Sequence, residues 1–255
     1  MKRSYWFVLT VLVIASLLLP ACGPKPVATE APIKVIVGTD ATWPPFENTD
    51  DAGNIIGFDI DLMKAIAEAE GFQVEFVNVG WDSLLAGMAT CQYDAAISAM
   101  TITAERAQSF NFSEPYFAAG QIVTVAFDNT DITGPDTLSG KTIGVQLGTT
   151  GDIEAQAIAG ATVKSYDGIA LAFQDLLNGQ VDAVIADNPL ALGYVGTNPD
   201  KLKVVGEAFT DENYGIAVCK TKTDLVDMIN RGLATVKAQG LIEELTTKWI
   251  VNAGN

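Results

Sequence analysis

The chain has 255 residues, enough for two modest domains with their own cores, and its hydrophobic fraction of 49% excludes a disordered or fibrous protein. The formal net charge of −16 argues against nucleic-acid binding, which requires a basic surface. The chain has no histidine and its three cysteines match no zinc or redox spacing, so we expect no metal site, no cofactor and no histidine-based catalysis.

The N-terminus has the pattern of a bacterial export signal. Lys2 and Arg3 precede an apolar run over residues 5–19, which is short for a membrane span but typical of a signal peptide. Residues 19–22 (LPAC) resemble a lipobox, although Pro20 departs from the usual small or β-branched residue. We expect a signal peptide over 1–21, a lipid anchor at Cys22 and a Pro- and Ala-rich tether over 22–32. The alternative is a simple N-terminal membrane anchor.

From residue 33 onward, short apolar strands alternate with amphipathic helices. In the first half, strands are predicted over 33–39, 73–79 and 94–100, and helices over 59–70, 81–90 and from 104. In the second half, strands are predicted over 141–146, 163–166, 181–186 and 214–219, and helices over 150–159, 169–178, from 189, 223–239 and 241–251. This alternation predicts open α/β sheets, which bind ligands beyond the carboxyl ends of their strands.

Two segments that follow predicted strands in the first half carry candidate ligand-binding residues. In residues 38–46 (GTDATWPPF), two prolines fix a loop that can hold an aromatic side chain over an apolar ligand stem. In residues 98–106 (SAMTITAER), Thr101 and Arg106 lie at a helix start, where amides and a guanidinium suit a carboxylate. Taken singly, the first could be a surface turn with a core tryptophan, and the second a capped helix with a solvated arginine.

Two more such segments lie in the second half. Residues 144–151 (GVQLGTTG) place a tight turn and a helix N-terminus after a strand, which can bind an anion. This segment is neither a Walker A loop nor a dinucleotide fingerprint. Asp187 follows the strand 181–186, where a carboxylate can meet an ammonium group. It could equally cap the helix that starts near Pro189.

Six stretches, in this order, resemble the polar-amino-acid family of periplasmic solute-binding proteins: GTDATWPPFE, IIGFDIDLMKAIAE, YDAAISAMTITAERAQSFNFSEPY, GKTIGVQLGTTG, VDAVIADNP and NYGIAV. The resemblance covers nearly all of residues 33–250. It implies a type II periplasmic-binding-protein fold, in which two open α/β sheets form two lobes joined by two hinge strands. Lobe one would comprise 33–115 and 215–255, lobe two 121–209, and the hinges 116–120 and 210–214.

The resemblance also implies a ligand set drawn from both lobes. Arg106 and the backbone amides of Thr101 and Thr150 would bind the α-carboxylate of an amino acid. Asp187, the Thr101 hydroxyl and the Ser98 carbonyl would bind its α-ammonium group. The complete expected set is Asp40, Trp43, Trp81, Ser98, Ala99, Thr101, Arg106, Gln146, Thr149, Thr150 and Asp187.

In this arrangement the ligand side chain would lie between Trp43 and Trp81, toward Asp40 and Gln146. Gln146 and the lack of a second basic residue in these segments disfavour glutamate and aspartate. We expect arginine or lysine, with glutamine or histidine as alternatives. The protein would be a monomer that delivers its ligand to the permease of an ABC importer.

A cleft enzyme of the same fold, similar to cyclohexadienyl or arogenate dehydratase, is the main alternative. Such an enzyme needs a general acid and extra cationic groups for a second carboxylate, whereas the ligand-binding segments provide only Arg106. A receptor sensor domain is disfavoured because no second apolar span is evident in the sequence.

Two cysteines remain after the N-terminal one. In the resembled fold the strands 94–100 and 214–219 are antiparallel neighbours, so Cys91 and Cys219 would lie at the edge of the sheet far from the ligand. An oxidising extracytoplasmic compartment permits a disulfide between them. Two free thiols are the alternative, because sequence spacing does not fix their separation.

Overall fold

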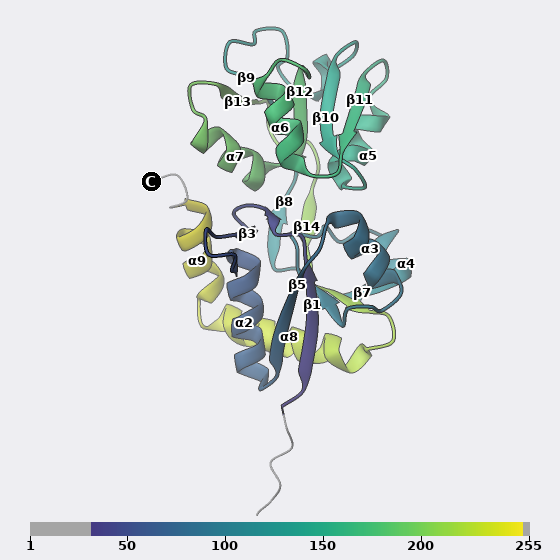
Figure 1. The fold of residues 1–255 in the computed structure, drawn as a ribbon, viewed down its shortest axis with the longest axis vertical. Helices are drawn as coiled ribbons and strands as arrows, with labels where there is room; N and C mark the ends of the chain where they lie inside the picture. The colour runs from purple at the N-terminus through teal and green to yellow at the C-terminus, as the bar shows by residue number, and fades with distance from the viewer. Residues whose placement is uncertain (1–31, 252–255) are drawn as a thin grey trace, which may run out of the picture. The chain divides into compact units, whose positions relative to one another are not determined.

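The computed structural model of the chain describes residues 32–251, in which two five-stranded sheets each pack against helices (Figure 1). The two sheets with their helices form lobe one and lobe two, which belong to one compact unit that begins at Pro32. No helix within residues 32–251 is long and apolar enough to cross a membrane. The predicted signal peptide and the lipid anchor at Cys22 lie outside the described residues.

Lobe one is built on a mixed sheet with strand order β5-β1-β6-β15-β7. The strand β1 pairs in parallel with β5 and β6, whereas β15 is antiparallel to β6 and β7. The elements of this lobe are β1 (Lys34–Thr39), β5 (Gln73–Asn78), β6 (Ala95–Ala96), β7 (Phe110–Phe112), β15 (Ala217–Cys219), α2 (Phe58–Glu70), α3 (Trp81–Ala89), α4 (Arg106–Ser109), α8 (Thr223–Ala238), α9 (Leu241–Thr246) and a π-helical turn (Thr247–Val251). The predicted end of α2 is confirmed, because Gly71 ends it in the left-handed conformation.

Lobe two is built on a second sheet with strand order β11-β10-β12-β9-β13. Its parallel strands β10, β11 and β12 are joined by helices, as the alternating pattern predicts, and β9 and β13 add antiparallel pairings. The elements of this lobe are β9 (Gln121–Ala126), β10 (Thr142–Gln146), β11 (Thr162–Tyr166), β12 (Ala183–Asp187), β13 (Leu202–Val205), a 3₁₀ turn (Pro135–Thr137), α5 (Thr150–Ala157), α6 (Ile169–Leu177) and α7 (Asn188–Thr197).

Two short strands connect the lobes. The strand β8 (Phe117–Ala119) lies between β7 and β9 in the chain, and β14 (Glu212–Tyr214) lies between β13 and β15. They pair antiparallel with each other and with neither large sheet, so the chain crosses between the lobes twice at one place (Figure 1). The predicted fold class, two open α/β sheets joined by two connecting strands, is confirmed.

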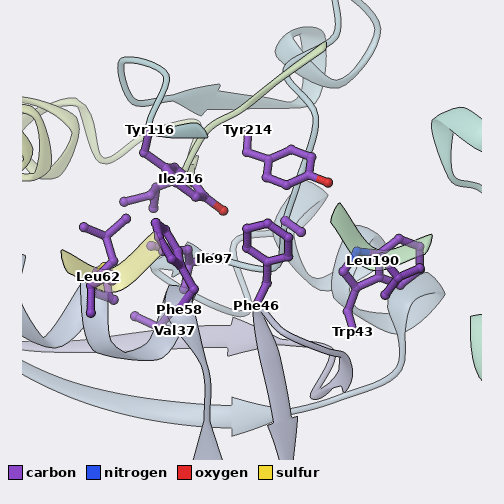
Figure 2. Packing of buried hydrophobic residues seen from close by; sticks show 14 of the residues in the cluster. Val37, Trp43, Phe46, Phe58, Leu62, Ile97, Tyr116, Leu190, Tyr214 and Ile216 are labelled. Carbon is purple, nitrogen blue, oxygen red and sulfur yellow. The ribbon is translucent and has the colours of Figure 1, made fainter. Parts of the chain in front are cut away.

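The loop after β1 is anchored beneath these connecting strands. It carries a small sheet of β2 (Thr42–Trp43), β3 (Glu47–Thr49) and β4 (Ile55–Ile56). The ring of Phe46 is fully buried and meets Phe58, Phe117 and Tyr214 edge-on, with ring centroids 5.1–5.7 Å apart. Figure 2 shows Phe46 beside Phe58 and Tyr214. Phe46 therefore belongs to the core and fixes the loop, whereas Trp43 lies at its end nearer to lobe two, where β2 packs against α6.

Three predicted elements differ from the observed ones. The strand predicted over 94–100 forms a regular strand only at Ala95–Ala96, and farther along the backbone enters the left-handed region at Ala99, with φ of 44°. The strand predicted over 214–219 is divided, because β14 pairs with β8 and β15 with β6 and β7. The helix predicted from 104 begins at Arg106, although the Thr103 hydroxyl accepts a hydrogen bond from the Arg106 amide as a cap would (3.1 Å).

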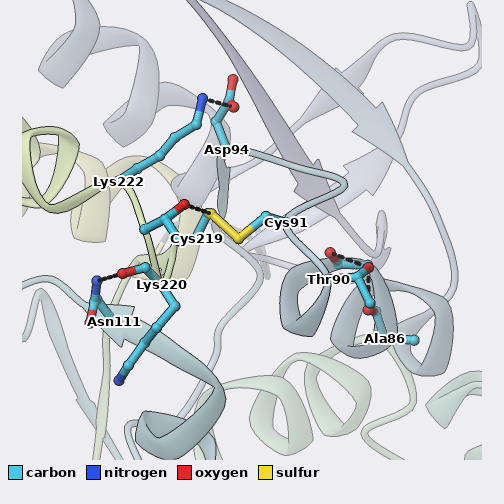
Figure 3. The surroundings of a disulfide bond; sticks show 10 residues. Ala86, Thr90, Cys91, Asp94, Asn111, Cys219, Lys220 and Lys222 are labelled. Carbon is cyan, nitrogen blue, oxygen red and sulfur yellow. Dashed lines mark hydrogen bonds and ion pairs between the residues drawn. A yellow bond between two sulfur atoms is a disulfide. The ribbon is translucent and has the colours of Figure 1, made fainter.

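Cys91 and Cys219 form a disulfide, with their Cα atoms 5.0 Å apart (Figure 3). The antiparallel pairing of β6 with β15 brings them together, since the Cys219 amide donates to the Asp94 carbonyl three residues after Cys91. Neither cysteine lines the ligand pocket described below. The structure thus selects the disulfide over two free thiols.

Reducing this disulfide is expected to lower the free energy of unfolding by about 2–4 kcal/mol, because the bond restrains a long loop of the unfolded chain. Denaturant titrations with and without reductant measure the change. A Cys91→Ala, Cys219→Ala double variant should show the lower stability and no response to reductant, with ligand affinity unchanged. Two reactive thiols in the unfolded, unreduced mature chain would contradict the bond.

Candidate functional site

A pocket lies between the two lobes, where segments following strands of both sheets meet. It encloses about 320 Å³ of space not filled by atoms, including solvent at its mouth. All of its lining residues were singled out in the sequence, and they are Asp40, Trp43, Trp81, Ser98, Ala99, Thr101, Arg106, Thr149, Thr150 and Asp187. The eleventh expected residue, Gln146, is buried next to the lining and contacts Asp40.

Asp40 follows β1 and is held by its neighbours in a buried position. Its amide donates to the Ser98 hydroxyl (3.0 Å), and one carboxylate oxygen accepts from the Thr42 hydroxyl (2.9 Å). The other oxygen accepts from Nε2 of Gln146 in lobe two (3.2 Å). Burial raises the pKa of Asp40, against the opposing effect of these hydrogen bonds. Next to it, Oε1 of Gln146 is buried without a hydrogen-bond partner among residues 32–251.

Arg106 is fixed by contacts to both lobes. Its Nη1 donates to the Thr101 carbonyl (2.8 Å) in lobe one, and its Nη2 donates to the Gly148 carbonyl (3.3 Å) in lobe two. The guanidinium lies over the Trp81 ring, 5.0 Å from its centroid, and Nε1 of Trp81 donates to the same Gly148 carbonyl (3.2 Å). Burial lowers the pKa of Arg106, while Asp187, Glu212 and Glu105 act in the opposite direction. Since arginine stays protonated in proteins, it is a fixed cation in the pocket.

Lobe two contributes the start of α5 and the end of β12. The Thr149 hydroxyl caps α5 by accepting from the Asp152 amide (3.2 Å), which places Thr150 at the first position of the helix. Asp187 occupies the capping position of α7, yet its side chain makes no capping hydrogen bond. It accepts instead from Nε2 of Gln121 and from the Tyr214 hydroxyl. Of its two possible roles, the structure therefore favours a carboxylate facing the pocket.

Burial raises the pKa of Asp187 to about 6, and the neighbouring charge of Glu212 acts in the same direction. Glu212 lies in β14 and was not foreseen. Its Oε2 accepts from the hydroxyls of Thr101 (2.6 Å) in lobe one and Thr150 (2.9 Å) in lobe two. Its Oε1 accepts from the Thr210 hydroxyl (2.9 Å) and from Nε2 of Gln121 (3.1 Å). A connecting strand thus orients one pocket hydroxyl from each lobe.

The charges around the pocket are unequal. Arg106 is the one basic residue among the lining side chains, whereas Asp40 and Asp187 line the pocket and Glu212 lies behind it. Within residues 32–251 no cluster of acidic, cysteine or histidine side chains could hold a metal ion. The site can therefore pair one anionic group with Arg106 and cationic groups with the carboxylates.

Comparison with known proteins places this site in context. Residues 35–252 match the family described as bacterial extracellular solute-binding proteins, family 3. A probable histidine-binding protein of Neisseria gonorrhoeae is 34% identical over 264 residues, covering 100% of this chain and 98% of that protein. The ABC transporter arginine-binding protein 1 of Escherichia coli (strain K12) is 38% identical, covering 85% of this chain and 90% of that protein. The structure of the arginine-, lysine-, histidine-binding protein ArtJ of Geobacillus stearothermophilus superposes with a TM-score of 0.81 at 40% identity, covering 86% and 96% of the two chains.

Proposed function

We propose that this chain, which belongs to family 3 of the bacterial extracellular solute-binding proteins, binds a basic amino acid between its two lobes and delivers it to an ABC importer. The observation that carries this proposal is the arrangement of one arginine and two carboxylates around a single pocket. Arg106 suits an α-carboxylate, Asp187 an α-ammonium group, and Asp40 a second cation farther along the ligand.

The main-chain part of the ligand would be bound from both lobes. The guanidinium of Arg106 and the amides of Thr101 and Thr150 would hold the α-carboxylate, with the start of α5 adding its positive end. Asp187, the Thr101 hydroxyl and the Ser98 carbonyl would hold the α-ammonium group. The hydrogen bonds that join Glu212 to both threonine hydroxyls support this arrangement, because they fix the direction of each side chain.

The side-chain part of the pocket favours a cation. The ligand's methylene stem would lie between Trp43 and Trp81, whose ring faces also attract a cationic group. At its end, the carboxylate of Asp40 and the unpartnered Oε1 of Gln146 are both acceptors. Arginine or lysine would pair with both, whereas glutamine would leave the buried charge of Asp40 without a cation. The binding of arginine, lysine or histidine by similar proteins supports this preference.

Capture would involve closure of the proposed lobes, 33–115 with 215–255 against 121–209, about hinges at 116–120 and 210–214. Contacts across the pocket support this motion, since Gly148 and Gln146 of lobe two hydrogen-bond to Trp81, Arg106 and Asp40 of lobe one. A ligand that contacts both lobes would favour the closed arrangement. We further propose that the mature protein is a monomer anchored to the membrane by lipid at Cys22.

The same pocket argues against the dehydratase-like alternative. Among the lining residues only Arg106 is basic, so a second carboxylate of a prephenate-like substrate would have no cationic partner there. Incubation with arogenate or prephenate should therefore yield no aromatic product. Formation of such a product would show that the protein is an enzyme and would contradict the proposed binding function.

Calorimetric titration with the twenty amino acids, after removal of bound ligand, tests the proposal. We expect arginine or lysine to bind most tightly, and Asp40→Asn to weaken both by at least about tenfold more than it weakens glutamine. Asp51→Asn, the same change at an exposed position of lobe one, should alter none of these affinities. Equal losses for all three ligands would mean that Asp40 is only structural, and no binding of any amino acid would refute the proposed function.

A further inference from the structure

Two acidic side chains are completely buried behind the pocket in lobe one. Glu47 lies at the start of β3 and Asp59 in the first turn of α2, and both have 0% exposure. Oε1 of Glu47 accepts from the Ser98 hydroxyl (2.9 Å). Oδ2 of Asp59 accepts from the Ala99 amide (2.7 Å) and from the Tyr116 hydroxyl (2.8 Å). The pair therefore holds two consecutive residues of the pocket lining.

The other oxygen of each carboxyl group is left without a donor. Oε2 of Glu47 and Oδ1 of Asp59 are buried and have no hydrogen-bond partner within residues 32–251, and the two residues are neighbours because the Asp59 amide donates to the carbonyl of Phe46, which precedes Glu47 (3.0 Å). Two ionised carboxylates buried side by side would repel, and no basic side chain hydrogen-bonds to either within the described part of the chain. One proton between them turns one oxygen into a donor and the other into its acceptor, so both groups are satisfied at once.

We propose that Glu47 and Asp59 share one proton and act as positioning residues that hold Ser98 and Ala99 in their ligand-binding conformation. This inference rests on the proposed function of the pocket. The backbone of Ala99 is in the left-handed region, with φ of 44°, which is unfavourable for alanine unless its surroundings hold it there. The hydrogen bond from the Ala99 amide to Asp59 provides such a restraint. The Ser98 hydroxyl donates to Glu47 and accepts from the Asp40 amide, so it connects Glu47 to Asp40.

The surroundings of the pair agree with a retained proton. Burial and the neighbouring charge of Asp59 raise the pKa of Glu47 well above its usual range, and Asp40 acts in the same direction. Burial raises the pKa of Asp59 to about 6, against the opposing hydrogen bonds from Ala99 and Tyr116. The hydroxyls of Tyr116 and Tyr214 also face this region, and burial raises the pKa of both, so they remain protonated. Beyond Tyr214 lie Asp187 and Glu212.

Substitutions of Glu47 distinguish a shared proton from a purely packing role of this side chain. In Glu47→Gln the amide supplies a permanent hydrogen to Asp59 and keeps an acceptor for Ser98, so arginine affinity at pH 7 should stay within about threefold of wild type. In Glu47→Ala both contacts are lost, and we expect affinity to fall by more than about tenfold. The exposed Glu68→Gln on α2 serves as the charge-matched control and should behave as wild type. Equal losses in Glu47→Gln and Glu47→Ala would overturn the shared proton.

The pH profile and a direct probe complete the test. As pH rises above 7, the wild-type affinity should fall relative to that of Glu47→Gln, because the shared proton is eventually lost. This ratio cancels the titration of the ligand's own amino group. Infrared spectra at pH 7, where the affinities are compared, should show a protonated carboxyl band in wild type and in Glu68→Gln, and no such band in Glu47→Gln. Absence of the band in wild type, or its persistence in Glu47→Gln, would refute the inference even if no amino acid binds.

Discussion

Replacing Arg106 with alanine is expected to abolish measurable binding of every amino acid ligand. The guanidinium is the one cation in the pocket lining, and its loss would leave the ligand's α-carboxylate buried without a charged partner. Breaking a buried charge pair in this way costs about 3–5 kcal/mol, or roughly two to four orders of magnitude in affinity. Isothermal calorimetry with arginine measures the effect directly.

Two further variants make this test specific. Arg106→Lys should also bind poorly, because a point charge cannot reproduce the planar fork that contacts the Thr101 and Gly148 carbonyls and lies over Trp81. Arg231→Ala removes an exposed arginine that pairs with Glu70 on α2; neither residue lines the pocket, so the affinity should be unchanged. If Arg106→Ala binds as tightly as wild type, the assignment of the pocket is wrong.

Replacing Asp187 with asparagine is expected to reduce affinity by a similar amount, about 2–5 kcal/mol, because the buried carboxylate proposed for the α-ammonium group would be lost. The substitution nearly preserves the shape of the side chain that Gln121 and Tyr214 contact. A loss of affinity would therefore result from the missing charge rather than from altered packing. Asp200→Asn, an exposed position of lobe two, provides the matched control. Unchanged affinity in Asp187→Asn would remove this residue from the site.

The same residue gives binding a defined pH dependence. The pKa of Asp187 is raised to about 6, and the group must be ionised to pair with an ammonium ion. Affinity should therefore fall as pH drops below about 6, and this fall should be smaller in Asp187→Asn, in which only the protonation of Asp40 remains to weaken binding.

Stability should respond to acid in the opposite direction. Because the folded pKa of Asp187 lies above the unfolded value, its contribution to stability is fully present below the unfolded pKa and is lost as pH rises through about 6. Asp59, with a pKa of about 6, acts in the same sense. The slope of unfolding free energy between pH 5 and 7 should therefore be smaller in Asp187→Asn, without disappearing.

Much of this architecture could be predicted because it depends on local sequence. The periodicity of α2 and its end at Gly71 follow from residues adjacent in the chain. The pocket residues were expected from the resemblance to the solute-binding family, and the rule that ligands bind beyond the carboxyl ends of parallel strands agrees with that expectation. Trp43, Thr101 and Arg106 all satisfy this rule, and the structure places them in one pocket.

What the sequence could not reveal depends on distant contacts. Glu212 hydrogen-bonds to Thr101, Gln121 and Thr150, which lie 62 to 111 residues away. An acidic residue in a short polar segment has the pattern of a solvated loop, whereas in the structure Glu212 is buried in a strand that pairs with β8. The left-handed backbone at Ala99 was equally hidden, because alanine carries no preference for that conformation.

The disulfide has a topological consequence for lobe two. Every strand and helix of that lobe, together with β8 and β14, lies in sequence between Cys91 and Cys219. The backbone from Cys91 to Cys219 and the disulfide therefore form a covalent ring that closes inside lobe one. Lobe two is part of this ring. A single break in the backbone of lobe two would leave one covalent molecule, in which both halves of the lobe-one sheet are still joined through sulfur. Lobe two can thus unfold or be cut without releasing β15 and α8 from the strands β1 and β6 of the lobe-one sheet.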